Sequence, residues 1–413
     1  MRIPQEVRKI LDTLTRAGFE AYAVGGCVRD ACLGRTPEDW DITTDALPAE
    51  VKKLFRRTVD TGLKHGTVTV LIGNDGYEIT TYRVDGAYSD GRHPDSVAFT
   101  PELSEDLKRR DFTINAMACA GDGSIVDLFG GRRDLEEGLI RCVGDPDARF
   151  SEDALRILRA LRFSAQLSFE IEGATMEALK RHAPNLVHVS RERILAELNK
   201  MILSPHPERM ALLSETGIAP YIGEGLRDFR PSAGISKLPK KKDVRWAAGF
   251  WTAGEGKARV FLKGLKSDNE TADGAELLCS ALRQPLPEDL YGTRRLLSGY
   301  GEQRTKELIL LRKAGFGTPV QEGATEAVEE MAEQILKNGD CLSVGGLAVS
   351  GRDLMRDGIK PGPELGRTLG MLLDRVLMEP ELNDADTLRR IAAERNARDG
   401  GPGGKNGNDD AAE

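Results

Sequence analysis

The sequence has few aromatic residues, few histidines and no paired cysteines. Phe, Trp and Tyr make up 5% of its 413 residues, and its five histidines form no H-E-x-x-H or other close pair. The six cysteines are scattered without a C-x-x-C spacing, which argues against a structural zinc site and against a disulfide scaffold. We therefore predict reduced thiols and a cytoplasmic protein.

Long hydrophobic runs are also missing. No apolar run reaches the roughly 18–20 residues that a membrane-spanning helix needs, and the N-terminus lacks the apolar centre of a signal peptide. We therefore expect no membrane association. The net charge of −8 argues weakly against bulk coating of nucleic acid, so any RNA binding must come from local clusters of cations.

What the sequence does contain is a globular composition, 40% hydrophobic and 30% charged, arranged in two successive patterns. Residues 20–100 hold short runs rich in β-branched and aromatic residues, bounded by Gly, Asp or Pro, with one helical stretch, AEVKKLF, among them. After about residue 145, helical spacing replaces this alternation. The pattern predicts an α+β fold, in which a small mixed sheet with helices is followed by helices only.

A glycine pair opens the strongest local motif, VGGCVRDACLGRTPEDWDITTD over residues 24–45. We predict a strand that ends at Gly25 and Gly26 and a helix that begins near Val28. Two glycines at such a turn let the backbone approach a phosphate, which the free N–H groups of the helix can bind. Arg29 adds a fixed cation. An ordinary tight turn has the same glycines, so the pair decides nothing by itself.

Two aspartates follow in the same motif. Asp39 and Asp41 flank Trp40 on a predicted strand, so the alternation of side chains places both carboxylates on one face. Two adjacent like charges are unfavourable without a cation between them, and their hard oxygens suit Mg²⁺. Glu78 lies on a later predicted strand. It completes an acidic cluster if the two strands are neighbours, and otherwise it is a charge on an edge strand.

A regular charge pattern occurs on the helix predicted over residues 151–166, for which Ser151 is the expected cap. Asp153 is followed by an arginine at every third position, Arg156, Arg159 and Arg162. A step of three residues falls about 60° short of a full turn. Asp153 and Arg156 can therefore act together, whereas Asp153 and Arg162 cannot share one face. The simpler alternative is a surface stripe of salt bridges.

Basic clusters occur in two further places. Residues 108–115, KRRDFTIN, put three adjacent cations before a turn, and by themselves they fit a solvated basic turn equally well. The helical part offers more cations that could meet RNA phosphates, although exposed lysines on loops are an equally good interpretation. These cations are Lys237, Lys240, Lys241, Lys242, Arg245, Lys257, Lys263 and Lys266.

In their order along the chain, the motifs GGCVRD, EDWDITT, KHGTVTV, YEITTYR, RRDFTIN, DLFGGRRDL and SEDALRILRALRF resemble those of class II tRNA nucleotidyltransferases. These CCA-adding enzymes belong to the polymerase β nucleotidyltransferase superfamily and are close kin of bacterial poly(A) polymerases. The resemblance covers about residues 1–215 and resumes at 347–388. It implies a polymerase-β-like head followed by an all-helical neck, body and tail.

The resemblance implies a role for each motif. Asp39 and Asp41 match the carboxylates that bind Mg²⁺ and activate the 3′-hydroxyl of tRNA, and Glu78 matches a third carboxylate nearby. Asp153 and Arg156 match the pair that selects C or A, because a carboxylate acceptor beside a guanidinium donor suits both bases and neither G nor U. The full set of implied nucleotide-binding residues is Gly25, Gly26, Arg29, Arg110, Asp111, Asp153, Arg156, Arg159 and Arg162.

The implied activity is stepwise addition of C, C and A to tRNA 3′ ends from CTP and ATP. It proceeds by two-metal nucleotidyl transfer, releases pyrophosphate and needs neither a nucleic-acid template nor an obligate protein partner. The Gly-rich loop 85–94 resembles the loop that full CCA-adding members use to switch from C to A, which favours complete addition. An A-adding member, a CC-adding member and a poly(A) polymerase are alternatives. A non-catalytic RNA-binding relative is the least favoured, because both aspartates are intact.

The resemblance and the composition together predict the domains. We expect a catalytic head (1–142), a helical neck with the nucleotide-selecting helix (143–205), a helical body (206–300) and a helical tail that binds tRNA (301–394). Residues 395–413 lack apolar bulk and are rich in Gly, Asn and Asp. We expect them to be disordered, because burial cannot offset the entropy lost on ordering them.

Overall fold

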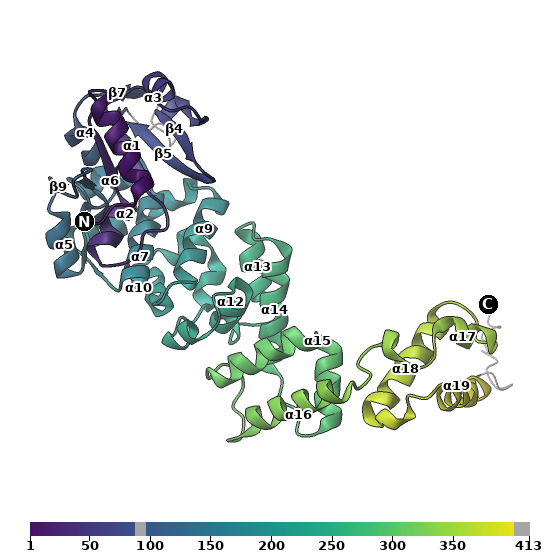
Figure 1. Ribbon diagram of the computed structural model, residues 1–413. Helices are drawn as coiled ribbons and strands as arrows, with labels where there is room; N and C mark the ends of the chain where they lie inside the picture. The colour runs from purple at the N-terminus through teal and green to yellow at the C-terminus, as the bar shows by residue number, and fades with distance from the viewer. Residues whose placement is uncertain (87–95, 400–413) are drawn as a thin grey trace, which may run out of the picture. The chain divides into compact units, whose positions relative to one another are not determined.

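The chain divides into two compact units, Met1–Leu277 and a second one that begins at Leu278. The computed structural model describes residues 1–86 and 96–399 (Figure 1). It confirms the predicted α+β class, because a mixed sheet with helices forms the start of the chain and helices dominate the rest. Among the described residues, no helix is long and apolar enough to cross a membrane. The finer division into neck, body and tail stays a prediction.

A seven-stranded mixed sheet forms the centre of the first 142 residues, the predicted head. Its strands are β1 (Ala21–Val24), β2 (Asp41–Thr44), β3 (Thr58–Gly62), β4 (Thr67–Ile72), β5 (Asp75–Thr81), β8 (Met117–Cys119) and β9 (Ile125–Asp127). Their order is β3-β4-β5-β2-β1-β8-β9, with β2 and β5 parallel and the other neighbours antiparallel. Val24 pairs with Asp41, so the turn after β1 lies beside the first residue of β2.

Helices and two small sheets surround this sheet, and one strand of the second small sheet, β11, comes from beyond residue 142. The helices are α1 (Gln5–Arg16), α2 (Gly26–Cys32), α3 (Pro48–Leu54), α4 (Leu103–Lys108) and α5 (Gly131–Glu137), with the 3₁₀ turns η1 (Leu63–His65) and η2 (Thr113–Asn115). The small sheets pair β6 (Arg83–Asp85) with β7 (Val97–Phe99), and β10 (Leu139–Ile140) with β11 (Glu170–Ile171). α1 packs on β1 and buries its four apolar residues at helical spacing, Val7, Ile10, Leu11 and Leu14.

The remainder of the first unit is helical. It contains α6 (Pro146–Glu152), α7 (Leu155–Leu167), α8 (Gly173–His182), η3 (Ala183–His188), α9 (Arg191–Ile202), η4 (Pro207–Ala211), α10 (Leu212–Glu215), α11 (Ala219–Ile222), η5 (Glu224–Asp228), η6 (Ala233–Lys237), α12 (Lys242–Phe250) and α13 (Lys257–Gly264). α7 is buried along most of its length and packs against α9. Its position lets one helix connect the head to the helices that follow.

The second unit has its own apolar core. Its elements are α15 (Leu290–Lys313), α16 (Ala324–Asn338), η7 (Val344–Gly346), α17 (Gly351–Arg356), α18 (Pro363–Met378), η8 (Pro380–Leu382) and α19 (Ala385–Asp399), and the boundary between the units falls within α14 (Asn269–Arg283). Leu354, Leu372 and Leu388 meet in one cluster that joins α17, α18 and α19. α15 bends at Gly301, where φ is 77°.

The structure differs from the sequence-based predictions in several local places. The expected strand DWDITT begins only at Asp41, and the stretch 206–216 is divided into η4 and α10, with Pro207 opening the first turn. α19 continues to Asp399, so residues 395–399 are helical where disorder was predicted. Residues 400–413 and the greater part of the Gly-rich loop, 87–95, lie outside the described residues.

Candidate active site

A cavity of about 970 Å³ in the first unit collects nearly all the predicted site residues. Its lining comes from the turn between β1 and α2, the segments 35–41 and 109–115, and parts of α7 and α9. Every predicted site residue except Glu78 lines it, namely Gly25, Gly26, Arg29, Asp39, Asp41, Arg110, Asp111, Asp153, Arg156, Arg159 and Arg162. Folding therefore brings motifs that are distant in the sequence into one place, which we call the catalytic cavity.

The turn after β1 requires its first glycine. Gly25 has φ 81° and ψ −129°, a backbone conformation that L side chains rarely adopt. A Cβ at this position would also lie 3.2 Å from Nη1 of Arg110. α2 begins directly at Gly26, two residues earlier than predicted. Glycine thus allows the backbone and the Arg110 side chain to border the cavity together.

Asp39 and Asp41 line the catalytic cavity, whereas Trp40 between them lines a different one. The predicted alternation of side chains is therefore correct, although Asp39 precedes the strand. Within the described parts of the chain, neither carboxylate makes a hydrogen bond or an ion pair. Burial raises the pKa of Asp41; the charge of Arg110 opposes this rise, and the charges of Glu78 and Asp39 add to it.

This pair of carboxylates fits a hard divalent cation. Mg²⁺ is commonly held by one or two carboxylates together with oxygens of a substrate phosphate, and the catalytic cavity offers two carboxylates near several arginines. A cation at this position would also relieve the repulsion that raises the pKa of Asp41. Among residues 1–86 and 96–399, no three His, Cys, Asp or Glu side chains form a metal site by themselves.

Glu78 lies on β5, which is the parallel neighbour of β2. The strands of Glu78 and Asp41 are thus neighbours, as an acidic cluster requires, and the charge of Glu78 helps to raise the pKa of Asp41. Its side chain is nevertheless exposed and does not line the catalytic cavity. The role of Glu78 as a third carboxylate stays a prediction.

Asp106 fixes two neighbouring arginines and was not among the predicted residues. Its buried carboxylate accepts hydrogen bonds from Arg109 at 2.7 and 3.0 Å, from Arg110 at 3.3 Å and from the Thr43 hydroxyl at 3.2 Å. Burial alone would raise the pKa of Asp106, but the two guanidiniums outweigh it and lower the pKa. The sequence contained a signal, because helical spacing places an acid three and four residues before the arginines.

Asp111 joins the head to α7. Its Oδ2 accepts a hydrogen bond from Nε of Arg159 at 2.7 Å, and its Oδ1 accepts one from the Asn115 amide at 3.2 Å. Burial would raise the pKa of Asp111, but Arg159 and Arg156 outweigh it, with these hydrogen bonds, and lower the pKa to about 2. Asn115 also accepts from Nη1 of Arg29 at 2.8 Å, so it links Arg29 to Asp111. Asn115 is a second residue that the prediction missed.

Asp153 does not begin a helix in the way predicted. The expected single helix is two, and Asp153 occupies the extended break between α6 and α7, with φ −146° and ψ 103°. Ser151 lies in the last turn of α6 and caps nothing there. Instead, Asp153 accepts the Leu155 N–H at 3.0 Å and a hydrogen bond from Arg193 of α9 at 2.7 Å. Because Asp153 lies outside the helix, it lines the same cavity as Arg162, contrary to prediction.

The salt bridge between Asp153 and Arg156 that the simpler alternative requires does not form, because each has other partners. Arg156 donates to Glu152 of α6 and, at 3.1 and 3.2 Å, to the carbonyl oxygens of Arg149 and Arg109. The surface stripe of salt bridges is therefore not what the structure shows. Arg156 and Asp153 instead line one cavity while other groups hold each of them in place.

Three guanidiniums surround the ring of Phe163, a residue that the prediction also missed. Those of Arg162, Arg29 and Arg159 lie 4.1, 5.0 and 5.7 Å from the ring centroid. Arg162 also pairs with the buried Glu197 of α9 at 3.2 Å, and burial lowers the pKa of Arg162 to about 10. An aromatic face attracts cations, so Phe163 lets three like charges gather beside the cavity.

The predicted RNA-binding cations of the helical part divide into two groups. Lys240 lines the catalytic cavity, together with Lys200 of α9. Arg245, in contrast, is buried and donates to the carbonyl oxygens of Ile202, Ser204 and other residues around it. The interpretation of Arg245 as an RNA-binding cation is wrong, because its donors are used inside the body.

Family models match three successive parts of the chain. They describe the head domain of poly A polymerase (residues 21–141), a probable RNA- and SrmB-binding site of polymerase A (168–229) and a putative tRNA nucleotidyltransferase domain 2 (238–392). The CCA-adding enzyme of Leuconostoc mesenteroides is 40% identical over 407 residues, which span 95% of this chain and 98% of the relative. The chain belongs to the CCA-adding family of tRNA nucleotidyltransferases.

Further comparisons agree with this membership. The CCA-adding enzyme of Geobacillus thermodenitrificans is 39% identical over 399 residues, covering 95% of this chain and 97% of its own. The crystal structure of the Bacillus stearothermophilus CCA-adding enzyme in complex with CTP is 34% identical, with a TM-score of 0.83. It covers 97% of this chain and 99% of its own. The family and the nucleotidyltransferase activity implied by the motifs are thus confirmed.

Proposed function

We propose that this chain adds C, C and A one at a time to the 3′ end of tRNA, using CTP and ATP, releasing pyrophosphate and needing no nucleic-acid template. One observation carries the proposal: the catalytic cavity combines two carboxylates without protein partners, Asp39 and Asp41, with arginines and with the pair Asp153 and Arg156. The relatives named as CCA-adding enzymes over nearly the full chain support it.

Asp39 and Asp41 would hold Mg²⁺. In the two-metal reaction that we propose, one bound ion would lower the pKa of the tRNA 3′-hydroxyl, and the other would hold the triphosphate and stabilise the departing pyrophosphate. The protein contributes the position of both carboxylates, since the pairing of Asp41 with Val24 places them beside the turn after β1.

Arg29 and Arg110 are the groups that we assign to the triphosphate, beside the backbone of Gly25 and Gly26. Asn115 and Asp30 fix the Arg29 guanidinium, at 2.8 Å each, and Asp106 fixes that of Arg110. Preorganised cations bind phosphate oxygens without a further cost in side-chain entropy at the moment of reaction.

The choice of nucleotide would follow from Asp153 and Arg156. Cytosine and adenine each present an amino donor next to a ring-nitrogen acceptor, whereas uracil and guanine present the opposite order. A carboxylate acceptor and a guanidinium donor held side by side therefore match the first two bases and not the others. Arg193 and the Leu155 N–H hold Asp153, while Glu152 holds Arg156, so neither group is free to adapt to U or G.

tRNA is the proposed macromolecular substrate, and we infer no membrane and no obligate protein partner for the reaction. The site of action that we expect is the cytoplasm. The Gly-rich loop 85–94, which favours complete CCA addition over a partial reaction, falls largely outside the described residues, so its role is argued from the sequence alone.

Three tRNA transcripts, ending before CCA, after C and after CC, test the proposal. Each is incubated with purified protein, Mg²⁺ and CTP, ATP or both, and read at single-nucleotide resolution. Addition of C, C and one A, followed by a stop, is the expected result. A stop after CC identifies a CC-adding member, and addition of A to the CC-ending transcript alone identifies an A-adding one. A long A ladder identifies a poly(A) polymerase, and no addition to any transcript contradicts the proposal altogether.

A further inference from the structure

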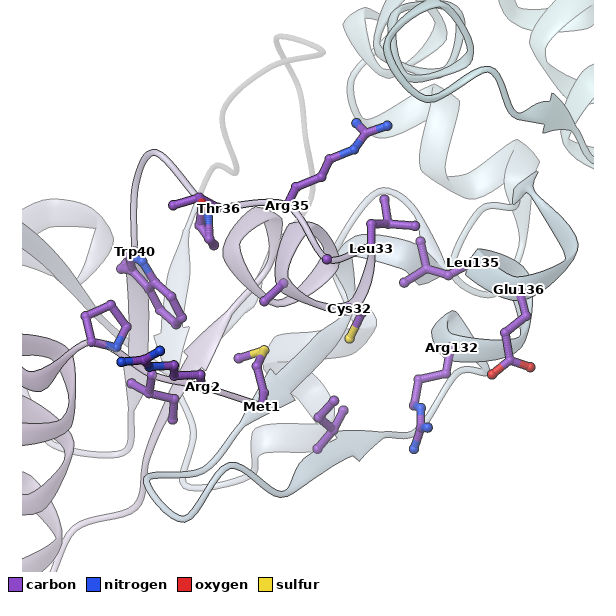
Figure 2. Close-up of a pocket in the computed structure, with 16 residues that line it drawn as sticks. Met1, Arg2, Cys32, Leu33, Arg35, Thr36, Trp40, Arg132, Leu135 and Glu136 are labelled. Atoms are coloured by element: carbon purple, nitrogen blue, oxygen red, sulfur yellow. The ribbon is translucent and has the colours of Figure 1, made fainter.

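A second cavity, of about 860 Å³, lies in the first unit beside the catalytic one. It is lined by the first residues of the chain, the end of α2 with the segment that follows it, Trp40, and parts of β9 and α5. Figure 2 shows Trp40 and Arg2 on one side, Arg132 and Glu136 on the other, and Cys32 between them, while the Arg35 side chain points away from this group. Nothing in the proposed addition reaction uses this cavity.

The lining combines cations with apolar surface. Arg2 and Arg132 make no side-chain hydrogen bond or ion pair within the described residues, and Glu136 is the one acidic residue of the lining. Ile3 and Leu135 are buried and supply apolar surface, and the Trp40 ring is half-buried. Unpaired guanidiniums favour an anion, and an indole face favours a flat aromatic ring. The chemistry of this cavity therefore favours one ligand that carries both.

One segment of chain, residues 35–41, contributes to the lining of both cavities. Arg35 and Thr36 line both of them, Asp39 lines only the catalytic cavity, and Trp40 lines only the second. Consecutive residues thus face opposite cavities at the place where the carboxylate pair is held. A ligand that contacts Trp40 would restrain the same short segment that carries Asp39 and Asp41.

We propose that the second cavity binds a free nucleoside monophosphate, with its base against Trp40 and its phosphate held by Arg2, which lies on the same side of the cavity (Figure 2). A pocket of roughly 300–1,000 Å³ suits a ligand of this size, and bases commonly stack on aromatic side chains while arginine holds the phosphate. The site is separate from the one that binds the reacting CTP or ATP. Its occupancy does not depend on transfer of the nucleotide.

Cys32 provides a direct probe, because it is exposed and lines the second cavity but not the catalytic one. The full-length protein is alkylated with and without AMP, and the modification of each cysteine is followed by peptide mass mapping. Labelling of Cys32 is expected to slow by the factor 1 + [AMP]/Kd, which is about tenfold at ten times the Kd. Cys341, in the second unit, serves as the internal reference and should not change.

One variant locates the effect and two serve as matched controls. Arg2→Ala should abolish protection by AMP, whereas Arg133→Ala should keep it, because Arg133 pairs with Glu137 and does not line the cavity. Arg110→Ala, which weakens the catalytic cavity, should also keep it. Thermal unfolding of each variant verifies the fold.

Three results would overturn the proposal. The first is the absence of protection by millimolar AMP in the wild type. The second is equal protection by inorganic phosphate or by adenosine alone, since neither carries both the ring and the charge. The third is protection that Arg110→Ala removes but Arg2→Ala leaves intact, which would assign the effect to the catalytic cavity.

Discussion

Two groups of carboxylates at the catalytic cavity differ in what balances their charge. Three of the four line the cavity, and the fourth, Asp106, is buried and bonds to Arg109 and Arg110, which line it. On the side of β2, Asp39 and Asp41 have no hydrogen-bond or ion-pair partner among the described residues, and burial raises the pKa of Asp41. On the side of α4 and α7, Asp106 and Asp111 are each tied to arginines, and the pKa of both is lowered. Arginines therefore balance the charges of Asp106 and Asp111, whereas the carboxylates of Asp39 and Asp41 have no such partner.

This difference separates chemistry from scaffold. Removing a carboxylate that pairs with a buried guanidinium leaves that charge uncompensated and destabilises the fold, whether or not a ligand is present. A carboxylate pair that the protein leaves unbalanced costs stability and gains its compensation only when a cation binds. We therefore expect variants of the two groups to change different quantities, activity in the first case and stability in the second.

The largest effect is expected from Asp41→Asn or Asp39→Asn. Either change removes a negative oxygen from the proposed Mg²⁺ site, so the rate of CMP addition should fall by about 10³-fold or more. The free energy of unfolding without metal should stay equal or rise, because the change also removes like-charge repulsion. Single-turnover addition assays and urea unfolding measure the two quantities. Asp75→Asn, an exposed change at the start of β5, is the matched control and should alter neither.

Asp111→Asn is expected to act on stability first. It leaves the Arg159 guanidinium without its charged partner and should lower the free energy of unfolding by about 2–3 kcal/mol, below the full cost of a buried pair because Arg159 is partly exposed. Glu192→Gln breaks the exposed pair with Lys266 and should cost less than about 0.5 kcal/mol. Equal costs for the two variants would contradict the view of Asp111 as a structural group.

The lowered pKa of Asp111 also predicts how the stability loss in Asp111→Asn depends on pH. The folded pKa of Asp111 is about 2, below the usual value of about 3.9 for an unfolded chain. The contribution of Asp111 to the free energy of unfolding is thus complete above its unfolded pKa. It is lost as the pH falls through its folded pKa. The difference in stability between wild type and Asp111→Asn should be constant from pH 5 to 7 and should shrink below about pH 4.

A smaller effect is expected for the choice of nucleotide. Asp153→Ala removes the acceptor that we assign to the base, so discrimination of CTP over UTP should fall by about 10–100-fold, equivalent to one lost polar recognition contact. Arg193→Ala should shift discrimination in the same direction but less, because it only frees Asp153. Competition assays with paired nucleotides measure both. Asp147→Asn, in α6 and outside the cavity, is the control. Unchanged preference for C and A in Asp153→Ala would refute the assignment.

The smallest effect is expected for Glu78→Gln. Glu78 influences Asp41 only through its charge and does not line the cavity. The rate of addition should therefore change by no more than about threefold, as for loss of a solvent-screened charge. A loss as large as that of Asp41→Asn would show that Glu78 is a metal ligand after all.

The sequence predicted the carboxylates without partners, Asp39 and Asp41, better than the arginine-paired carboxylates, Asp106 and Asp111. Asp39 and Asp41 are two positions apart, so the alternation expected of an extended segment was enough to place them on one side, although the strand begins only at Asp41. The motif set also predicted five of the eight arginines that line the cavity, missing Arg35, Arg109 and Arg193, and α1 buried the four apolar residues at helical spacing. Local periodicity and ordered motifs were therefore sufficient for the fold class and for most of the site.

What the sequence could not predict depends on contacts between distant segments. The break at Asp153 is stabilised by Arg193, 40 positions later in the chain, so helical periodicity gave one helix where there are two. Asn115 links Arg29 to Asp111, and Phe163 collects guanidiniums from two elements. No local pattern marks either residue. Arg245 was misjudged for the same reason, since its burial depends on carbonyl groups of four surrounding residues or more.

The difference between the Asp39–Asp41 pair and the arginine-paired carboxylates is tested most directly by the effect of Mg²⁺ on the free energy of unfolding. This effect is measured by urea unfolding without nucleotide or tRNA. If the Asp39–Asp41 pair awaits a cation, Mg²⁺ should raise the free energy of unfolding of the wild type by about 1.4 kcal/mol at ten times the Kd. Asp111→Asn should keep this increase from its lower starting value, and Asp41→Asn should lose it. No increase in the wild type, or an equal increase in Asp41→Asn, would contradict the account.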